Sequence, residues 1–565
     1  MSPLAATLVC FAIYAIGYRF YARRIARRSF ELDSSRPTPA HVLADGRDYV
    51  PTRKAVLFGH HYASIAGLAP MLGPAIAVIW GWVPAMIWVV VGTILVGAVH
   101  DFSALCLSIR ARGKSIGRIA EDIIGRRAKY LFHVLIVFLI GLAMGVFVQV
   151  VSQLFSTTFY PEAVTPSTAV MVLAIAIGFL SYRRGVSLRI LVPIGATLLF
   201  VSIWLGGVIP APDLSVTTWS YGLLGYAFCA SVLPVWLLLQ PRDFLNSILL
   251  YLALIGIFVS FVILNPEFAA PAYNPQPSGA PPIFPFVFIV IACGAVSGFH
   301  ALVSSGTTSK QIDNEKDAPA IGYGGMIGES ILGLSAVLAT TAGFSSRAAW
   351  HTHFASWEAA NGLADKLNAY ISGAANFLTT IGIPLEAGKA FMALVAVSFA
   401  LTTLDSATRI LRYNIEEISD SIRVPLLGNR YIASLLAVGV IGFFALLRIP
   451  AGNGEMIPAG TALWALFGTT NQIMAGLTLL AVTLYLYFRK KPFIYVIVPM
   501  VFMVATTISA MVYNLGHYVE DGNVLLAAVG LAVLALAVGL VVEGILRFTK
   551  GREQAIAGIR RAFGD

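Results

Sequence analysis

The sequence predicts an all-α polytopic membrane protein of about 15 transmembrane helices, arranged around a five-plus-five inverted repeat. The first observation is composition: 58% of the 565 residues are hydrophobic and only 12% are charged, whereas soluble proteins average about 25% charged residues. The second is a series of apolar stretches long enough to cross a bilayer, and the third is that two stretches are interrupted near their middle. This composition excludes a soluble globular enzyme, a disordered regulator and a nucleic-acid-binding module.

Fifteen apolar stretches approach the length of about 20 residues that a helix needs to cross the hydrocarbon core, where every backbone polar group must be satisfied within the protein. Basic residues follow the first stretch rather than precede it, so this stretch is expected to remain as a helix and not to be cleaved as a signal peptide. The stretches are 3–21, 60–80, 83–108, 130–155, 168–182, 188–209, 220–239, 245–264, 284–304, 320–343, 386–404, 431–447, 461–487, 493–513 and 524–548.

The distribution of Lys and Arg sets the predicted orientation. When the loops alternate sides through the fifteen stretches, only Arg347, Lys366, Lys389 and Arg448 of the 38 Lys and Arg residues fall on one side. Cytoplasmic loops are the ones enriched in these residues. We therefore expect a multi-pass membrane protein with its N-terminus outside and its C-terminus in the cytoplasm. The lipid bilayer is its expected partner, and no nucleic-acid partner is expected, because the positive charge is explained by the cytoplasmic loops.

No linker or low-complexity tract suggests a separate soluble domain, so one compact membrane domain is expected. Its longest outer stretch, 344–385, has helical apolar spacing and is expected to lie on the membrane surface or to pack over the bundle as a lid. The predicted regions are an N-terminal helix and loop (1–55), a first five-helix repeat (56–210), a second five-helix repeat (219–410), four C-terminal helices (430–548) and a cytoplasmic tail (549–565).

The 60–80 stretch is interrupted, because two glycines and two prolines fall within residues 67–74. Each proline removes an N–H donor and frees carbonyl groups of the preceding turn. In lipid the freed groups need protein, water or an ion as partner, so unwound backbone at mid-membrane favours a cation or substrate site. We predict that Gly67, Ala69 and Pro70 contact the substrate. The alternative is an ordinary proline kink packed against its neighbours.

A second interruption is predicted at Ser231–Pro234, inside the 220–239 stretch. Five stretches separate the starts of the two broken helices, so the two run in opposite directions. Two five-helix halves of opposite topology, each beginning with a discontinuous helix, are typical of inverted-repeat secondary transporters, whose substrate sites lie at the repeat interface. Ser231 and Pro234 are therefore also predicted to contact the substrate.

Five motifs, in order along the chain, resemble the carbon starvation protein A family, and the likeness extends from about residue 50 to residue 510. Members of that family are bacterial inner-membrane proteins implicated in the uptake of peptides, and of pyruvate in some branches, when nutrients are scarce. The family is grouped with the amino acid–polyamine–organocation superfamily, so the resemblance implies a LeuT-like inverted repeat. The motifs are FGHHYASIAGLAPMLGPAIA (58–77), GAVHDFSALCLSIRARGKSIGRIAED (97–122), SVLPVWLLLQPRDFL (231–245), SGFHALVSSGTTSKQI (297–312) and ALTTLDSATRI (400–410).

The resemblance also implies a sodium site. In the superfamily, hydroxyl groups on the third helix of the second half join backbone carbonyls of the first break to hold the ion. The matching groups here are the hydroxyls of Ser304, Ser305 and Thr308, with carbonyls near Ile65 and Leu68. The alternative is a helix C-terminus capped by its own hydroxyl side chains. No metal other than sodium is expected.

Two histidines are candidates for contact with a proton or the substrate. His61 opens the first broken helix, and His300 lies on a stretch expected to be its neighbour. Histidine titrates near neutral pH and can relay a proton or bind a carboxylate; satisfied interface histidines are the alternative. Asn471 and Gln472 lie outside the ten-helix core and are predicted to hydrogen-bond between helices.

Two acidic residues are candidates for proton coupling, because ionisable groups at membrane depth are costly and usually functional. Asp101 lies in the inner half of its stretch, and its alternative role is to cap or to pair with a basic residue such as Arg110. Glu329 is the most isolated acid, near the middle of its stretch. Its alternative is a structural hydrogen bond to Gln149 or Gln153.

Four charged residues at the predicted inner ends of spanning stretches are candidates for a gate. Arg242 and Asp243 follow the second interruption directly. Asp405 and Arg409 lie one helical turn apart and resemble a cytoplasmic gate pair; an i,i+4 pair on the surface is the alternative.

The sequence contains no phosphate-cradling loop, zinc-protease motif or nucleophile elbow, so neither a primary pump nor an enzyme is expected. We expect an importer of small organic nutrients without a cofactor, driven by Na⁺ or H⁺ through alternating access. Short peptides are favoured over pyruvate as substrate, and a channel or a nutrient sensor is the alternative from another class. The four cysteines all lie in apolar runs and are expected to be buried thiols: Cys10, Cys106, Cys229 and Cys293.

Overall fold

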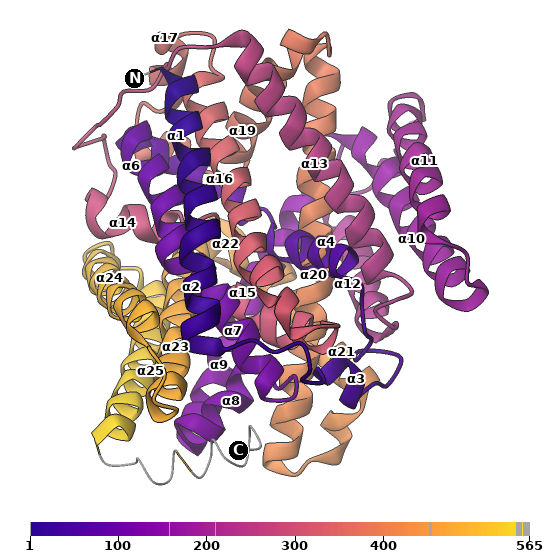
Figure 1. Cartoon of the computed structure of the whole chain (residues 1–565). Helices are drawn as coiled ribbons and strands as arrows, with labels where there is room; N and C mark the ends of the chain where they lie inside the picture. Colours follow the sequence, from indigo (N-terminus) through magenta and orange to yellow (C-terminus); the bar gives the residue numbers. More distant parts are fainter. Residues whose placement is uncertain (1, 158, 210, 451–454, 550–555, 557–565) are drawn as a thin grey trace.

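The computed structural model describes every residue except 1, 158, 210, 451–454, 550–555 and 557–565, and it is a bundle of helices (Figure 1). Among the described residues, eleven helices are long and apolar enough to cross a membrane, or twelve if one bent pair counts as a single span. The chain is therefore an all-α multi-pass membrane protein, as predicted. The predicted tail, 549–565, lies almost wholly outside the described residues.

The eleven spans include the longest helices of the chain. They are Pro3–Phe30 (with α1, Pro3–Ile16, and α2, Arg23–Ile25), Trp82–Arg110 (with α6, Trp82–Ile87, and α7, Ala98–Arg110), α9 (Arg126–Leu154), Pro161–Arg184 (with α10, Val164–Arg184), α11 (Leu188–Val208), α13 (Leu239–Leu264), Glu315–Ala342 (with α16, Gly324–Ala342), α20 (Leu385–Ile422), Trp464–Phe488 (with α23, Phe467–Phe488), α24 (Ile494–Glu520) and α25 (Val524–Thr549).

The predicted count of fifteen spans is not confirmed. Four predicted stretches are helical, but none of them forms one long span. Two correspond to helices of 17 residues, α12 (Val216–Val232) and α21 (Arg430–Leu446). The other two are each divided in two: α4 (Lys54–Ile65) with α5 (Ala69–Ala77), and α14 (Ile283–Val290) with α15 (Gly298–Gly306).

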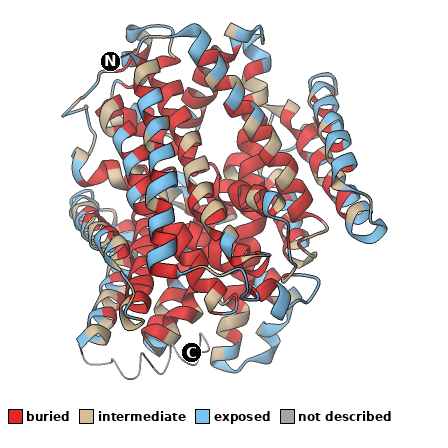
Figure 2. Cartoon of the chain, viewed as in Figure 1, coloured by how far each residue is buried: buried red, intermediate tan, exposed pale blue. Residues whose placement is uncertain are grey.

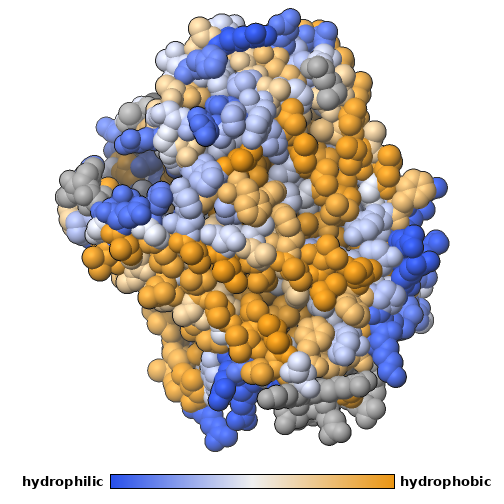
Figure 3. Space-filling view, turned by 90° about the vertical axis from the view of Figure 1, so that its left-hand side faces the viewer, coloured by the Kyte–Doolittle hydropathy of each residue, from blue (hydrophilic) through white to orange (hydrophobic). Residues whose placement is uncertain are grey.

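The outside of the bundle is apolar, as contact with lipid requires. α1 and the pair α10–α11 expose one side to the surroundings (Figure 2), and exposed side chains there include Leu8, Ile194 and Trp204. Figure 3 shows an apolar belt that crosses one face of the molecule between hydrophilic upper and lower ends. Cys229 on α12 is also exposed, so the prediction of four buried thiols is wrong for this residue.

The outer segment 344–385 packs into the bundle. Its main helix, α19 (Leu363–Leu378), contacts α5, α16 and α20 and buries Tyr370 and Phe377 completely. Whether this segment moves as a lid stays a prediction. The remaining short elements are α3 (Pro39–Val42), α8 (Ile116–Ile123), α17 (Arg347–His353), α18 (Trp357–Ala360), α22 (Ala459–Ala462) and the antiparallel strands β1 (Arg448–Pro450) and β2 (Met456–Pro458).

The first predicted interruption is confirmed. α4 ends at Ile65, α5 begins at Ala69, and the pair is bent by 52°. Pro70 stands in the first turn of α5, where a missing N–H donor removes no helical hydrogen bond. Gly67, between the helices, lies so close to Thr403 of α20 that a Cβ atom would be 2.9 Å from its hydroxyl oxygen. The break is therefore packed tightly against α20.

The prediction of a break inside a span at Ser231–Pro234 is wrong. α12 ends at Val232 and α13 begins at Leu239, so Pro234 lies in the turn between two helices. Proline marks a turn between helices as readily as a break within one, and local sequence does not separate the two cases.

The second discontinuous helix is formed instead by α14 and α15, which are separated by residues 291–297. Gly294 has a φ of 91°, a conformation that glycine adopts without steric cost. The hydroxyl of Thr93 lies 3.3 Å from the carbonyl oxygens of both Gly294 and Ala295, and Gln472 of α23 donates to a third carbonyl of the break at 3.1 Å. The prediction that Gln472 hydrogen-bonds between helices is confirmed, and what it stabilises is this break.

The two breaks face each other. A Cβ atom on Gly73 of α5 would collide with the carbonyl oxygen of Val290, at the end of α14. A Cβ atom on Gly294 would lie 3.5 Å from the Cα atom of Pro70. The second break and the first turns of α5, which directly follow the first break, thus meet at one place inside the bundle.

Candidate functional site

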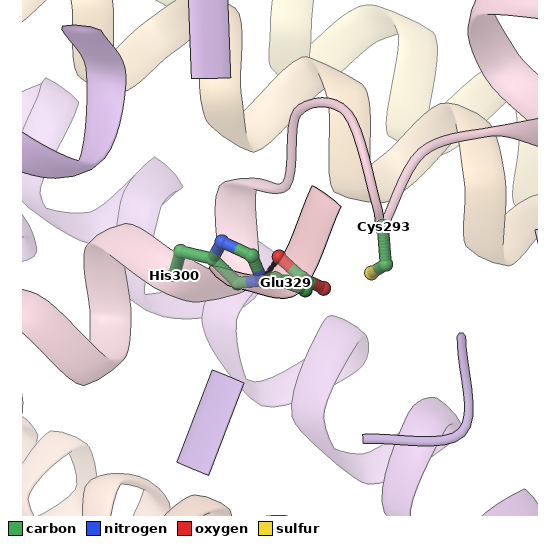
Figure 4. A group of neighbouring side chains, drawn as sticks. All are labelled: Cys293, His300 and Glu329. Carbon is green, nitrogen blue, oxygen red and sulfur yellow. Dashed lines mark ion pairs between the residues drawn. The ribbon is translucent and has the colours of Figure 1, made fainter. Parts of the chain in front are cut away.

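Side chains of α7, α15 and α16 form a chain of polar contacts beside the second break. Nδ1 of His300 is 2.9 Å from Oδ2 of Asp101, and Nε2 of His300 is 3.2 Å from Oε2 of Glu329. The other oxygen of Asp101 is 2.8 Å from Nδ1 of His100. All four side chains are fully buried. Together with Cys293 of the break we call them the buried polar cluster, and Figure 4 shows its Cys293, His300 and Glu329.

This cluster brings together three of the residues that the sequence singled out. Asp101 contacts two histidines and not Arg110, which pairs with Glu315 instead. Glu329 contacts His300, not a glutamine. The alternatives considered for both acids are therefore replaced by one shared site.

His61 lies near the end of α4, beside the first break. Its Nδ1 is 2.8 Å from the hydroxyl of Thr308, and its Nε2 has no hydrogen-bond partner among the described residues. The ring packs against Gly325 of α16, where an added Cβ would lie 2.8 Å from Cδ2 of the ring. One nitrogen of a fully buried histidine is thus left available for a proton or a ligand.

The groups of the predicted sodium site have mixed surroundings. The hydroxyl of Ser305 donates to a carbonyl one turn earlier (2.7 Å) and accepts from a backbone N–H of α8 (3.2 Å). The hydroxyl of Thr308 contacts the histidine of α4, and the carbonyls of Ile65 and Leu68 accept hydrogen bonds from backbone N–H groups. The hydroxyl of Ser304 has no partner in the described part of the chain. A sodium site here stays a prediction.

At the end of the bundle predicted to face the cytoplasm, Arg242 is fully buried between two carboxylates. Its Nη2 is 2.5 Å from Oδ1 of Asp243, and its Nη1 pairs with Asp405 of α20. Nη1 also donates to the hydroxyl of Tyr226 at 2.6 Å. The second oxygen of Asp243 contacts Nδ1 of His60 at 2.5 Å. One buried network therefore joins α4, α12, α13 and α20.

Arg409 forms a second network with the loop that precedes α4. Its Nη1 donates to Oδ1 of Asp48 at 2.7 Å, and its Nη2 donates to the carbonyls of Ala230 (2.6 Å) and Leu233 (2.5 Å) at the end of α12. Arg412 also pairs with Asp48 at 3.1 Å. Although burial acts to raise the pKa of Asp48, the charges of Arg409 and Arg412 lower it below its ordinary value. Asp48 is therefore an anion that fastens the loop to α20.

The prediction that Asp405 and Arg409 form a pair, either as a gate or on the surface, is wrong. Both side chains are fully buried, and their partners are Arg242 and Asp48 respectively. The i,i+4 spacing places two side chains on one face of a helix, but it does not say which other elements reach that face.

A cavity of about 570 Å³ extends from the outer segment and the end of α24 to the two breaks. Its floor includes Ala69 and Gly73 of α5, and Ala292 and Cys293 of the second break. Polar and aromatic side chains of its wall include Trp357, Asn361, Lys366, Tyr513, His517 and Asp521. The cavity therefore connects the end of the bundle predicted to face outside with the place where the two breaks meet.

Lys366 is a buried cation in this cavity. Its side chain is 6% exposed, and its Nζ donates to Oδ1 of Asn361 at 3.0 Å. Burial lowers the pKa of Lys366 to about 8, against a smaller opposite effect of Asp365. The sequence places Lys366 in an outer loop, and only the amphipathic spacing of residues 344–385 indicates that one face of this segment turns inward.

Of the residues predicted to contact the substrate, one lies in the lining of this cavity. Ala69 is part of its lining. The hydroxyl of Ser231 contacts the hydroxyl of Ser434 at 3.0 Å, and Pro234 lies in the turn after α12, so the structure places neither of them at this cavity. Beside the breaks, but not in the cavity lining, lie Gly67, Pro70, His61 and His300.

The chain matches the family model described as carbon starvation protein CstA over residues 3–346 and 346–510. It is 35% identical to the peptide transporter CstA of Campylobacter jejuni, over 93% of this chain and 82% of that protein. It is 33% identical to the peptide transporter CstA of Escherichia coli, over 88% of this chain and 79% of that protein. The pyruvate/proton symporter BtsT of Escherichia coli is 40% identical over 60% of this chain and 49% of its own length.

Among solved structures, a mutant of the manganese transporter of Eremococcus coleocola superposes with a TM-score of 0.49. The match has 12% identity and covers 92% of this chain and 99% of that chain.

Proposed function

Because the chain belongs to the carbon starvation protein CstA family, we propose that it is a secondary active transporter that imports small organic nutrients, short peptides above all, across the bacterial inner membrane. Two relatives that align over most of their length are named as peptide transporters, and a relative that aligns over about half of its length is named as a pyruvate/proton symporter. Import proceeds by ion-coupled alternating access under carbon starvation.

The observation that carries this proposal is the contrast between the two ends of the bundle. The cavity reaches Ala69 and Cys293 at the two breaks from one end, while Arg242 and Arg409 are enclosed by buried ion pairs near the other. Transporters with discontinuous helices bind substrate near such breaks and expose the site to one side at a time. With the basic loops on the cytoplasmic side, this arrangement corresponds to a state that is open to the outside.

Two features of the cavity support a peptide over pyruvate. Its volume of about 570 Å³ lies within the range of about 300–1,000 Å³ that is common for sites of drug-sized ligands. Lys366 offers a cation to a carboxylate, and Asp521 at the mouth offers an anion to a protonated amine. A zwitterionic peptide can use both charges, whereas pyruvate can use only the cation.

The proposal includes an inverted repeat of residues 56–210 and 219–410 within about fifteen membrane-crossing segments. The two discontinuous helices, α4–α5 and α14–α15, correspond to the second and the ninth of the fifteen predicted stretches. An odd number of steps separates them, so in this topology they run in opposite directions. The second break then falls in the third helix of its half and not in the first.

The coupling ion is a proton or sodium, and the relative named as a pyruvate/proton symporter favours the proton. Asp101 and Glu329 are the candidates to carry it, and Ser304 is the candidate sodium ligand that lacks another partner. The networks of Arg242 and Arg409 are the candidates for the inner gate. These roles are proposals that rest on burial and contacts.

Uptake into proteoliposomes tests the proposed function. A labelled dipeptide and labelled pyruvate are supplied in turn, with proton and sodium gradients imposed separately. We expect the dipeptide to accumulate under an inward proton gradient, and we expect a protonophore to abolish this accumulation. Accumulation of pyruvate but not of the dipeptide would show that the substrate is pyruvate, the alternative, and not a peptide. Absence of gradient-driven uptake of both compounds would contradict the proposal.

A further inference from the structure

We propose that Cys293, His300 and Glu329 bind one thiophilic divalent cation of the zinc class. One ligand atom from each side chain lies within 4.8 Å of the other two. The three residues come from different elements: the second break, α15 and α16. Cys293 also lines the cavity, so a cation has a route to the site from the end predicted to face outside.

The donor atoms are turned toward one another, and the sulfur of Cys293 also contacts the hydroxyl of Ser297 (3.3 Å) and the amide of Asn471 (3.5 Å). Figure 4 shows the sulfur of Cys293 directed toward the side of the Glu329 carboxylate, which meets the ring of His300. Both carboxylate oxygens of Glu329 and Nε2 of His300 lack an aligned hydrogen bond in the described structure, although the two groups are 3.2 Å apart and fully buried. Buried polar atoms without a partner are costly. One bound cation would satisfy all of them.

The contacts behind these donors are those that a metal-binding histidine needs. Nδ1 of His300 is 2.9 Å from Oδ2 of Asp101, and Asp101 is itself held by His100. A carboxylate on the second nitrogen orients a ligating imidazole and raises its basicity. Cys293 is positioned by the hydroxyl of Ser297, 3.3 Å from its sulfur. Two of the three ligand side chains, His300 and Cys293, are therefore held in place before any cation binds.

The donor set selects the class of cation. Zinc accepts thiolate, imidazole and carboxylate ligands together in tetrahedral geometry, with bonds of about 2.0–2.3 Å and with a fourth position open to water. Calcium and magnesium prefer sites made of oxygen alone. Tetrahedral geometry places neighbouring ligand atoms about 3.3–3.8 Å apart for such bonds, close to the 3.2 Å between His300 and Glu329. Cys293 reaches this separation with a small shift of the unwound segment that carries it.

A consequence for transport rests on the proposed function. The cation would tie Cys293 of the second break to Glu329 of α16, beside the cavity floor. If the break must move relative to α16 during the transport cycle, the bound cation locks one conformation. We therefore expect zinc to inhibit uptake.

Titration of the full-length protein in detergent with Co²⁺, a spectroscopic substitute for Zn²⁺, tests the site. At one equivalent we expect a thiolate-to-cobalt charge-transfer band and the visible bands of tetrahedral cobalt, both displaced by Zn²⁺. Cys293→Ser should remove the charge-transfer band, whereas Cys106→Ser, which changes a buried thiol of α7 outside the cluster, should retain it. Asp101→Asn leaves the three ligand side chains unchanged but alters the contact behind His300, and it should weaken binding by about 10–100-fold.

Wild-type protein without a charge-transfer band at one equivalent, or a band that persists in Cys293→Ser, would overturn the inference. The spectrum needs no substrate, so it decides the metal site whether or not transport is found. Inhibition of dipeptide uptake by Zn²⁺ tests the consequence separately, and Cys293→Ser should raise the inhibitory concentration at least 10-fold. Equal inhibition of this variant and the wild type would refute the locking of the break.

Discussion

The two ends of the bundle use buried charge in opposite ways. At the cavity end, the ammonium group of Lys366 hydrogen-bonds to the neutral amide of Asn361. At the other end, Arg242 contacts two carboxylates and Arg409 contacts Asp48 and two carbonyls. A buried charge without an opposite partner is costly, while a paired one is compensated. At one end the buried cations are therefore compensated by carboxylates, whereas at the other end the contact of the buried cation is a neutral amide.

The largest effect is expected from breaking a pair at the closed end. Asp405→Asn keeps the size of the side chain but removes one carboxylate from Arg242. We expect a loss of about 3 kcal/mol in the free energy of unfolding, because removal of one partner leaves a buried charge undercompensated. We also expect dipeptide uptake at background level. Thermal unfolding in detergent and proteoliposome uptake measure the two effects.

A matched change on the surface provides the control. Glu386→Gln removes the carboxylate of an exposed pair with Lys389 and should change the unfolding free energy by less than about 1 kcal/mol. If Asp405→Asn were as mild as this variant, the inner network would not hold the bundle closed.

The next effect concerns the contact between the two breaks. Gly73→Ala places a methyl group against the carbonyl oxygen of Val290, and overpacking of this kind typically costs about 1–3 kcal/mol. We expect a lower melting temperature and reduced uptake. Gly222→Ala on α12 is the control, since no atom lies within 4 Å of the added Cβ. Equal behaviour of both variants would mean that the breaks do not touch.

A smaller effect is expected at the open end. Lys366→Gln removes the cation that we assign to the substrate carboxylate. Loss of one charge-assisted hydrogen bond, worth about 1.5 kcal/mol, should raise the KM for a dipeptide about 10-fold. Lys389→Gln removes a more exposed lysine outside the cavity lining and should leave the KM unchanged. A KM that is equal in both variants would exclude Lys366 from the site.

The smallest effect is a dependence on pH. With a pKa of about 8, Lys366 loses its proton as the pH rises through 8, so the KM for a dipeptide should increase above this pH. The increase should be absent in Lys366→Gln. Stability should also depend on pH. Between the folded pKa and the ordinary lysine value of 10.5 the unfolded chain binds more protons than the folded chain, so the free energy of unfolding rises with pH across this window. A flat KM between pH 7 and 9 would contradict the assignment.

The two breaks differ in how far the sequence predicts them. The break after Ile65 was predictable because prolines act locally on the helix that contains them. The break at residues 291–297 contains no proline, and its local signal is limited to Gly294 and the Ser297–Gly298 pair. Thr93, Asn471 and Gln472 supply its hydrogen bonds from other elements. Tertiary contacts stabilise this break, and such contacts cannot be predicted from the residues next to it in the sequence.

The site residues show the same division. Asp101 and Glu329 were predictable, because acids stand out in apolar stretches. Their partner His300 was identified separately, but no pattern indicated that the three would meet. Asp48 was missed as a partner of Arg409 because 361 positions separate the two in sequence. Lys366 was missed because only the packing of α19 turns it inward.

The most direct test of the account is to determine from which side of the membrane a reagent reaches the first break. Ala69→Cys, on the cavity floor, is introduced into a variant whose four native cysteines are replaced, and a membrane-impermeant thiol reagent is applied to right-side-out and inside-out vesicles in turn. The account predicts labelling from the outside that saturating dipeptide slows. Labelling from the cytoplasmic side alone, without protection by dipeptide, would contradict it.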